Sequence, residues 1–294
     1  MIRFFQNIIN IIVSLFTSTS YKIGTKIFEE PRPWKLSCLT NTKFGLFEGT
    51  YNGESRRDSR LYLNGKLIYS GNDETIGQGL EFGNIIYFAG ENGNLLIYNN
   101  NIITRGVRLA FASCCVEFNG KLYVFNSIQN QGINVINCLT NVTEFKMPGS
   151  GIVTQALVDG GKLYSAASDG AGGIACNDGT MIPLPNCQCI ISFANSIYCS
   201  SGNKVMEKIG NTVKEVKILD CEKIMGMNVN KDLLWVAGSN PDALWVFDRR
   251  MRCKQIGKLE GSVPVGGSVF RSHVTNEYFG RCADGNRAEV YKID

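Results

Sequence analysis

Residues 116–148 read VEFNGKLYVFNSIQNQGINVINCLTNVTEFKMP, and this stretch decides the fold of the chain. The Asn-Gly pair at 119–120 separates two apolar runs, and such a pair favours a tight β-hairpin. The run at 122–125 predicts a short buried strand, and residues 133–137 alternate in polarity like a half-buried strand. A last edge strand is expected over 142–145. The stretch therefore predicts one four-stranded antiparallel sheet.

The same pattern recurs along the chain after about residue 35. Each copy has an inner strand with an apolar–aromatic pair, and a turn residue or a charge precedes most of these pairs. Successive aromatic residues lie about 34 to 43 positions apart, a period expected of the four-stranded blades of a β-propeller. We interpret these aromatic side chains as core. They are Phe47, Tyr87, Tyr123, Tyr164, Tyr198, Trp235 and Tyr278.

The later half of each copy predicts a second hairpin, with two strands joined by a short polar turn. The turns are rich in Asn and Gly, which suits a chain with 32 glycines and only 7 prolines. Two of the copies are weaker than the others, those at 174–184 and 204–218. The clearer hairpins are expected at 60–71, 94–106, 133–145 and 244–257.

The copies together predict an all-β fold, a single β-propeller of about seven four-stranded blades, with six blades as the alternative. The last copy, at 288–294, is one strand short, and a strand predicted at 22–28 is left over. If that early strand completes the last blade, no open sheet edge remains at the joint. We therefore predict an N-terminal amphipathic helical segment over 1–20 and a propeller over 21–294.

The repeat also resembles the kelch family. KLYVFN, followed after a loop by INVINCLTNVTEFKMP, is similar to a kelch strand and its hairpin, and so is LWVFDRRMRCKQIGKL at 244–259. The glycine doublet that follows the first strand in that family is reduced here to single glycines, and Phe145 stands in place of the hairpin tryptophan. The resemblance covers most of residues 35–294 and implies a kelch-like propeller rather than any one kelch protein.

Residues 1–20, MIRFFQNIINIIVSLFTSTS, are the most apolar segment and predict a short amphipathic helix. A basic start before an apolar run resembles a signal peptide, but no small-x-small cleavage site follows cleanly. The run is also shorter than the roughly 20 residues of a transmembrane helix. The apolar face needs a cover: the body of the same protein, another protein subunit or, with less support, a membrane surface. We predict that it docks onto another subunit through Phe5, Ile8, Ile9, Ile12 and Phe16.

Composition excludes several classes of partner. The net charge of +4 is small and the basic residues are scattered, so no nucleic-acid surface is predicted. The eleven cysteines are expected to be mostly reduced and buried, because a chain of this size does not need a disulfide framework. Cys187 and Cys189 are too close for a zinc knuckle and there is a single histidine, so neither a metal nor a cofactor is predicted.

The sequence offers no catalytic constellation. The one histidine, His273, is expected in a surface loop. Glycoside hydrolysis needs two carboxylates about 5–10 Å apart, and nothing singles out a pair among Glu48, Glu81, Glu117 and Asp159.

We therefore predict a non-enzymatic interaction or structural module in a larger assembly, such as a phage or viral particle. An intracellular assembly or a virion is favoured over secretion. The alternative is a propeller enzyme that acts on carbohydrate at the mouth of the central channel.

Overall fold

The structure is a computed structural model that describes residues 21–55, 58–72, 75–90, 94–108, 114–128, 132–149, 152–168, 172–259, 273–275, 277–283 and 287–294. The helix predicted over 1–20, with its five docking residues, lies outside the described residues. Within the described residues there is no helix that could cross a membrane.

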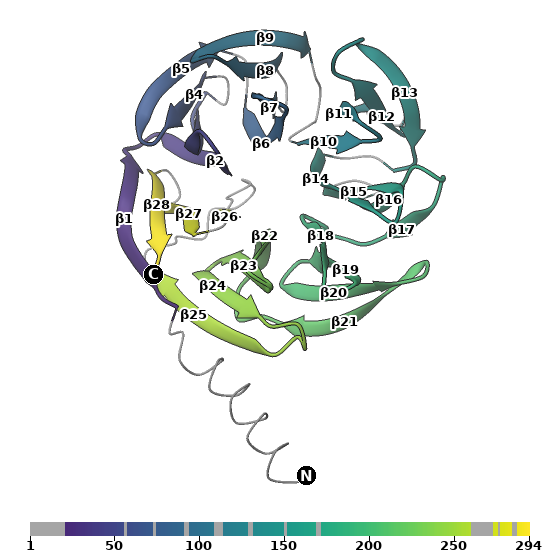
Figure 1. Cartoon of the computed structure of the whole chain (residues 1–294). Coiled ribbons are helices and arrows are strands. Elements are labelled where there is room, and N and C mark those ends of the chain that lie inside the picture. Colours follow the sequence, from purple (N-terminus) through teal and green to yellow (C-terminus); the bar gives the residue numbers. More distant parts are fainter. Residues whose placement is uncertain are drawn as a thin grey trace, which may run out of the picture.

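Seven four-stranded antiparallel sheets stand around a central axis (Figure 1). The chain is a seven-bladed β-propeller, so the predicted fold class is confirmed and the six-blade alternative is wrong. Blades 1 to 6 are built from consecutive strands, β2–β5 through β22–β25, and blade 7 has the order β1-β28-β27-β26. The strands are β1 Ile23–Glu30, β2 Trp34–Thr42, β3 Gly45–Asn52, β4 Asp58–Leu63, β5 Lys66–Asn72, β6 Ile76–Phe82, β7 Ile85–Gly90, β8 Asn94–Asn99, β9 Ile102–Arg108, β10 Cys115–Phe118, β11 Lys121–Ile128, β12 Gly132–Asn137, β13 Val142–Met147, β14 Ile152–Asp159, β15 Lys162–Ser168, β16 Gly173–Cys176, β17 Met181–Pro183, β18 Ile190–Phe193, β19 Ser196–Ser201, β20 Lys204–Ile209, β21 Thr212–Ile218, β22 Lys223–Asn230, β23 Leu233–Ser239, β24 Asp242–Phe247, β25 Cys253–Leu259, β26 His273–Thr275, β27 Tyr278–Ala283 and β28 Arg287–Ile293.

Blade 3 is the sheet predicted from residues 116–148. Asn119 and Gly120 both have left-handed backbones, with φ of 51° and 70°, and join β10 to β11. Positive φ at both central residues gives the turn a twist that matches the strands it connects, which is why Asn and Gly are preferred there. Phe118 consequently pairs with Lys121 directly across the turn. We call the face of the ring that carries these first-to-second-strand turns the turn face.

The aromatic row lies on the second strand of each blade, so the prediction that it belongs to an inner strand of the sheet is confirmed. The innermost strands are the first ones, such as β2 and β6, which face the axis and contact each other between blades (Figure 1). The prediction that the row is core is confirmed for the six residues from Phe47 to Trp235, which are all buried. The ring of Phe47, for example, packs 5.2 Å from that of Phe88 in the next blade.

The ring is closed by β1, which pairs with β28 as the outermost strand of blade 7. The last residue of β1, Glu30, is buried and accepts hydrogen bonds from three side chains of blade 1. Thr50 Oγ1 and Arg60 Nη1 donate at 2.6 Å each, and the Tyr62 hydroxyl donates at 2.5 Å. One carboxylate thus ties the two ends of the propeller together, because a buried charge is stable only when its oxygens are satisfied.

Blade 7 is also tied to blade 6 by a buried charge. The Arg281 guanidinium donates to Glu289 at 2.8 Å and lies 3.7 Å from Asp242 of blade 6. Burial alone would raise the pKa of Glu289, but hydrogen bonds from Tyr291 and Arg281 outweigh it and lower this pKa below its ordinary value. Both joints of the closing blade therefore combine apolar packing with charge-assisted hydrogen bonds.

Candidate functional site

The first strands of four blades break register with the second strand at the same level. One extra residue is inserted each time: Ser37 in blade 1, Thr154 in blade 4 and Met225 in blade 6, while the shift in blade 2 lies between Ile76 and Gly79 and includes Gln78. A β-bulge leaves a residue unpaired and re-aims its side chain. Because the first strands are innermost, these bulges direct their side chains toward the central channel.

Blade 5 also directs a side chain toward the channel, but without a regular bulge. Its first strand, β18, begins at Ile190, and the two residues before it lie outside the ladder. Their backbone N–H groups, of Gln188 and Cys189, both donate to the Ser200 hydroxyl, at 3.0 and 3.1 Å. The Ser200 hydroxyl thus replaces a backbone carbonyl as the acceptor for these two N–H groups. It holds Gln188 at the level of the bulges.

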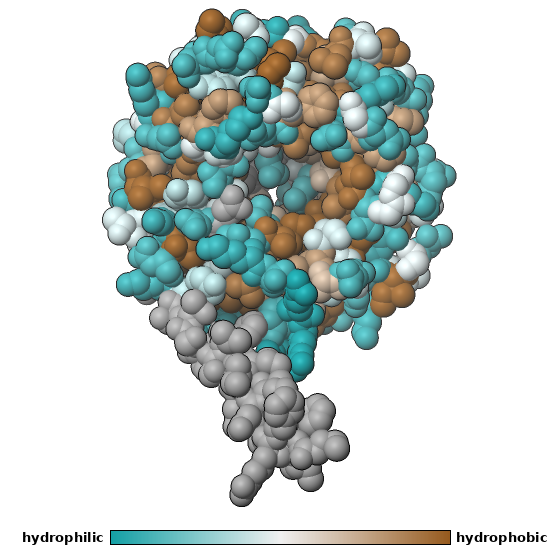
Figure 2. Space-filling model, in the orientation of Figure 1, coloured by the Kyte–Doolittle hydropathy of each residue, from teal (hydrophilic) through white to brown (hydrophobic). Residues whose placement is uncertain are grey.

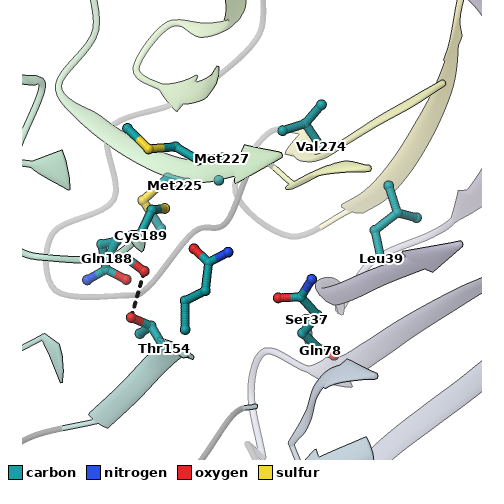
Figure 3. A pocket seen from close by; sticks show the side chains of 11 residues that line it. Ser37, Leu39, Gln78, Thr154, Gln188, Cys189, Met225, Met227 and Val274 are labelled. Atoms are coloured by element: carbon teal, nitrogen blue, oxygen red, sulfur yellow. Dashed lines mark hydrogen bonds between the residues drawn. The ribbon is translucent and has the colours of Figure 1, made fainter. Parts of the chain in front are cut away.

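Figure 2 shows a hollow at the centre of the ring, and these residues line a pocket in the channel (Figure 3), which we call the channel constriction. Gln188 and Thr154 lie together on one side of it, and Ser37 and Gln78 lie on the other. The space between them is about 40 Å³, which is room for about one water molecule. The lining residues are Ser37, Leu39, Gln78, Thr154, Gln155, Gln188, Cys189, Met225, Gly226, Met227 and Val274.

The constriction is polar but uncharged. Thr154 Oγ1 donates to the backbone carbonyl of Gln188 at 2.7 Å, and the Ile190 N–H donates to Gln155 Oε1 at 3.1 Å. The Ser37 hydroxyl is buried and has no partner among the described residues. Such groups hold water or another neutral hydrogen-bonding group, and none of them is a general acid or base near neutral pH.

A larger opening lies on the turn face, beside the channel, between blades 4, 5 and 6. We call it the turn-face groove, and its volume is about 560 Å³, within the range of ligand sites. It is formed where the first strands of these blades end, together with the turns that follow. The lining residues are Asp159, Ser192, Phe193, Ala194, Asn195, Val229, Asp232 and Arg249.

The groove carries three charged side chains. Asp159, at the end of β14, accepts a hydrogen bond from the Ser192 hydroxyl at 2.9 Å. Asp232 accepts one from Arg249 at 2.6 Å, and both of these side chains are largely exposed. Among the residues that the structure describes, no lysine or arginine pairs with Asp159. The lining therefore has a net charge of one negative unit.

The four carboxylates considered for glycoside hydrolysis are on four different blades and have different environments. Glu48 is buried between strands of blade 1, and burial raises its pKa to about 7. Glu81 is paired with Lys43, and hydrogen bonding from that lysine lowers the pKa of Glu81. Glu117 is exposed on β10, and Asp159 lies in the turn-face groove.

His273 is the first residue of β26 and pairs with Gly280. The prediction of a loop at this position is therefore wrong: the innermost strand of blade 7 begins here. The described residues contain no group of three or more His, Cys, Asp and Glu side chains arranged to hold a metal.

All eleven cysteines are free thiols, and only Cys115, Cys138 and Cys253 are partly exposed. Burial raises the pKa of Cys199 and of Cys221 to about 12. Thiols of this kind behave as small apolar side chains, because the thiolate is the nucleophile and is scarcely populated. The expectation that the cysteines are mostly buried is therefore confirmed, and their reduced state stays a prediction.

Sequence reasoning missed both openings. A signal for the bulges exists, since a polar or small residue interrupts an apolar run just inside the first strands, as in Leu36-Ser37 and Val153-Thr154. The groove has no such signal. Its residues come from three blades and become neighbours only when the ring closes.

No protein-family model and no curated protein sequence matches this chain. Solved structures do share its architecture. The BBS1N structure, solved in complex with ARL6DN, has a TM-score of 0.59 and 13% identity over 93% of this chain and 97% of that chain. BamB from Moraxella catarrhalis has a TM-score of 0.55 and 11% identity over 90% of this chain and 85% of that one. The likeness is one of fold alone.

The extracellular domain of BT4673 from B. thetaiotaomicron has a TM-score of 0.64 and 11% identity. The match covers 91% of the present chain but only 39% of that chain. At such identities the comparison supports the seven-bladed ring and carries no residue roles, because one fold hosts many functions.

Proposed function

We propose that this propeller is a non-enzymatic interaction module within a larger assembly. The observation that carries the proposal is the chemistry of the openings on the described surface. The channel constriction offers amides, hydroxyls and thioethers, and the turn-face groove adds an exposed ion pair and one further carboxylate. These groups are suited to binding. That BBS1N was solved with a protein partner makes protein partners a reasonable class for this fold.

The N-terminal segment is the proposed attachment point. Phe5, Ile8, Ile9, Ile12 and Phe16 would form one apolar face on a helix, and such a face is stable in water only when covered. We propose that another subunit of the assembly covers it. A phage or viral particle is the setting that we propose on the composition, and the kelch-like character of the blades remains a proposal of the same kind.

The test is the solution mass of the full chain beside a chain that begins at Thr19, measured by light scattering. We expect the full chain to self-associate, or to retain a subunit copurified from its own assembly, and the shortened chain to be a monomer. Ile8→Glu with Ile12→Glu should have the effect of the truncation. Asn10→Glu and Gln6→Glu, on the polar face, are the matched controls and should change nothing. Identical monomers throughout would refute the attachment role.

A further inference from the structure

The turn-face groove differs from the channel constriction in size and in charge. Its volume of about 560 Å³ compares with about 40 Å³ in the channel, so only the groove has room for a side chain with its flanking backbone. Its described lining contains two carboxylates and one guanidinium. The electrostatic preference of the groove is therefore for a cation.

Asp159 is the group with spare binding capacity. One carboxylate oxygen, Oδ1, accepts the hydrogen bond from Ser192 at 2.9 Å, which fixes the orientation of the side chain. The second oxygen, Oδ2, has no partner among the described residues. An ammonium or guanidinium group placed there would make a charge-assisted hydrogen bond, which is stronger than a neutral one.

Asp232 is a second acceptor, but Arg249 already occupies it. The two side chains are 67% and 72% exposed, so this ion pair is weak and exchangeable. A cationic ligand must therefore compete with Arg249 for Asp232, whereas Asp159 is available at once.

The apolar part of the lining suits the stem of a long basic side chain. Phe193 is buried at the end of β18, and Val229 is half-buried near the end of β22. Lysine and arginine cover apolar surface with their methylene groups while the charged head stays polar. A groove with an apolar wall and one free carboxylate matches both parts of such a side chain.

The walls of the groove are built from tight turns with left-handed backbones. Three residues that are neither Gly, Asn nor Asp have left-handed φ in the described chain: Ala194 at 49°, Lys231 at 49° and Met251 at 58°. Ala194 lines the groove, Lys231 is next to Asp232, and Met251 is in the same turn as Arg249. Ala194-Asn195 and Lys231-Asp232 have positive φ at both central residues, the same hairpin geometry as Asn119-Gly120, so tight turns fix the position of this wall.

We propose that the turn-face groove binds a lysine or arginine side chain presented by a partner protein, with the cation on Asp159. This inference rests on the proposed function, since it names a surface through which the interaction module would bind. None of the residues that line the groove belongs to the N-terminal segment, so each proposal can fail without the other.

The probe is the tripeptide acetyl-Gly-Lys-Gly-amide, titrated into the full chain and followed by backbone amide NMR shifts. We expect saturable shifts at Ala194, Asn195 and Asp232. The same peptide with an acetylated lysine has nearly the same shape without the charge, and a glutamate peptide has the opposite charge. Neither should shift these amides. Equal shifts from the charged and acetylated lysine peptides would overturn the proposal.

Three variants separate specific binding from general attraction. Asp159→Asn keeps the acceptor for Ser192 and should weaken binding of the lysine peptide about fivefold. Arg249→Gln frees Asp232 and should strengthen it a few-fold. Glu81→Gln makes the same change in net charge outside the groove, in blade 2, where Glu81 pairs with Lys43, and should have no effect.

If Glu81→Gln weakens binding as much as Asp159→Asn, the proposal is wrong. If the full chain keeps its assembly partner while the lysine peptide fails to bind, only the groove proposal falls and the interaction role stands. If the partner is lost from the shortened chain alone, the N-terminal attachment is supported independently of the groove.

Discussion

Glu48 is a buried carboxyl group whose protonation should control the stability of blade 1. It lies on β3, between Leu39 of β2 and Tyr62 of β4, and its exposed fraction is 1%. The Gly65 N–H donates to its Oε2 at 3.3 Å, and no ion pair to Glu48 is present in the described part of the chain. Burial raises its pKa from 4.5 to about 7, since the hydrogen bond only partly opposes the loss of hydration.

The sign of the effect follows from linkage. The folded state favours the protonated carboxyl, so the wild-type chain keeps its full stability below about pH 4.5 and loses it as the pH rises through about 7. A difference of about 2.5 pKa units corresponds to about 3 kcal/mol above pH 8. Most of this loss of folding stability occurs between the ordinary pKa of 4.5 and the folded-state pKa of about 7.

Glu48→Gln removes the charge and keeps an acceptor for Gly65. We expect the variant to be more stable than the wild type by about 3 kcal/mol at pH 8 and equal to it near pH 4.5. The assay is urea unfolding at pH 4.5, 6 and 8, with circular dichroism as the signal. Glu117→Gln, which changes an exposed carboxylate of β10, is the control and should shift neither curve.

The refuting result is a constant difference between Glu48→Gln and the wild type at all three pH values. That outcome would mean that the carboxyl of Glu48 does not titrate between pH 4.5 and 8 in the folded chain. We would then conclude that the Glu48 side chain is hydrated or paired with a cation, and not buried as the structure indicates.

Three further predictions concern the ring, its core and its thiols. Glu30→Ala should lower the free energy of unfolding by about 3 kcal/mol in urea titrations, because it leaves the hydrogen-bond donors of blade 1 without their acceptor. Glu29→Ala, on the exposed face, should lower it by less than about 1 kcal/mol. Equal losses of stability would contradict the role of Glu30 at the joint. Phe47→Ala should lower the free energy of unfolding by about 3–5 kcal/mol in the same measurement. Phe44→Ala, at an exposed position, should lower it by about 1 kcal/mol or less. Similar losses for both variants would place Phe47 outside the core. Cys221, whose pKa burial raises to about 12, should react with iodoacetamide at pH 8 at least about a hundredfold more slowly in the native chain than in urea, as followed by mass spectrometry; equal rates would show an accessible thiol.

The strands, the turns and the number of repeats could be predicted from the sequence because they depend on neighbouring residues. The turn at Asn119 and Gly120 needs two left-handed residues in a row, and Asn and Gly adopt that conformation at little cost. Alternating polarity, as in residues 133–137, indicates which side chains face the core. The leftover strand near the N-terminus and the incomplete last copy together pointed to the pairing of β1 with β28.

Prediction failed where local signals were ambiguous. His273 was assigned to a loop, although it pairs with Gly280 at the start of β26. That strand is only three residues long, too short for alternation to be visible.

Sequence alone determined a propeller of about seven blades and predicted the burial of its aromatic row, because backbone hydrogen bonding and side-chain alternation are local. Only the tertiary structure decided what the ring can bind. The bulges of four blades converge at one level of the channel, and Asp159, Ser192 and Asp232 meet although they belong to three blades. The raised pKa of Glu48 and the three hydrogen bonds to Glu30 are decided in the same way. Burial and electrostatic interaction depend on distances in space, and the closed ring sets those distances between residues far apart in the chain.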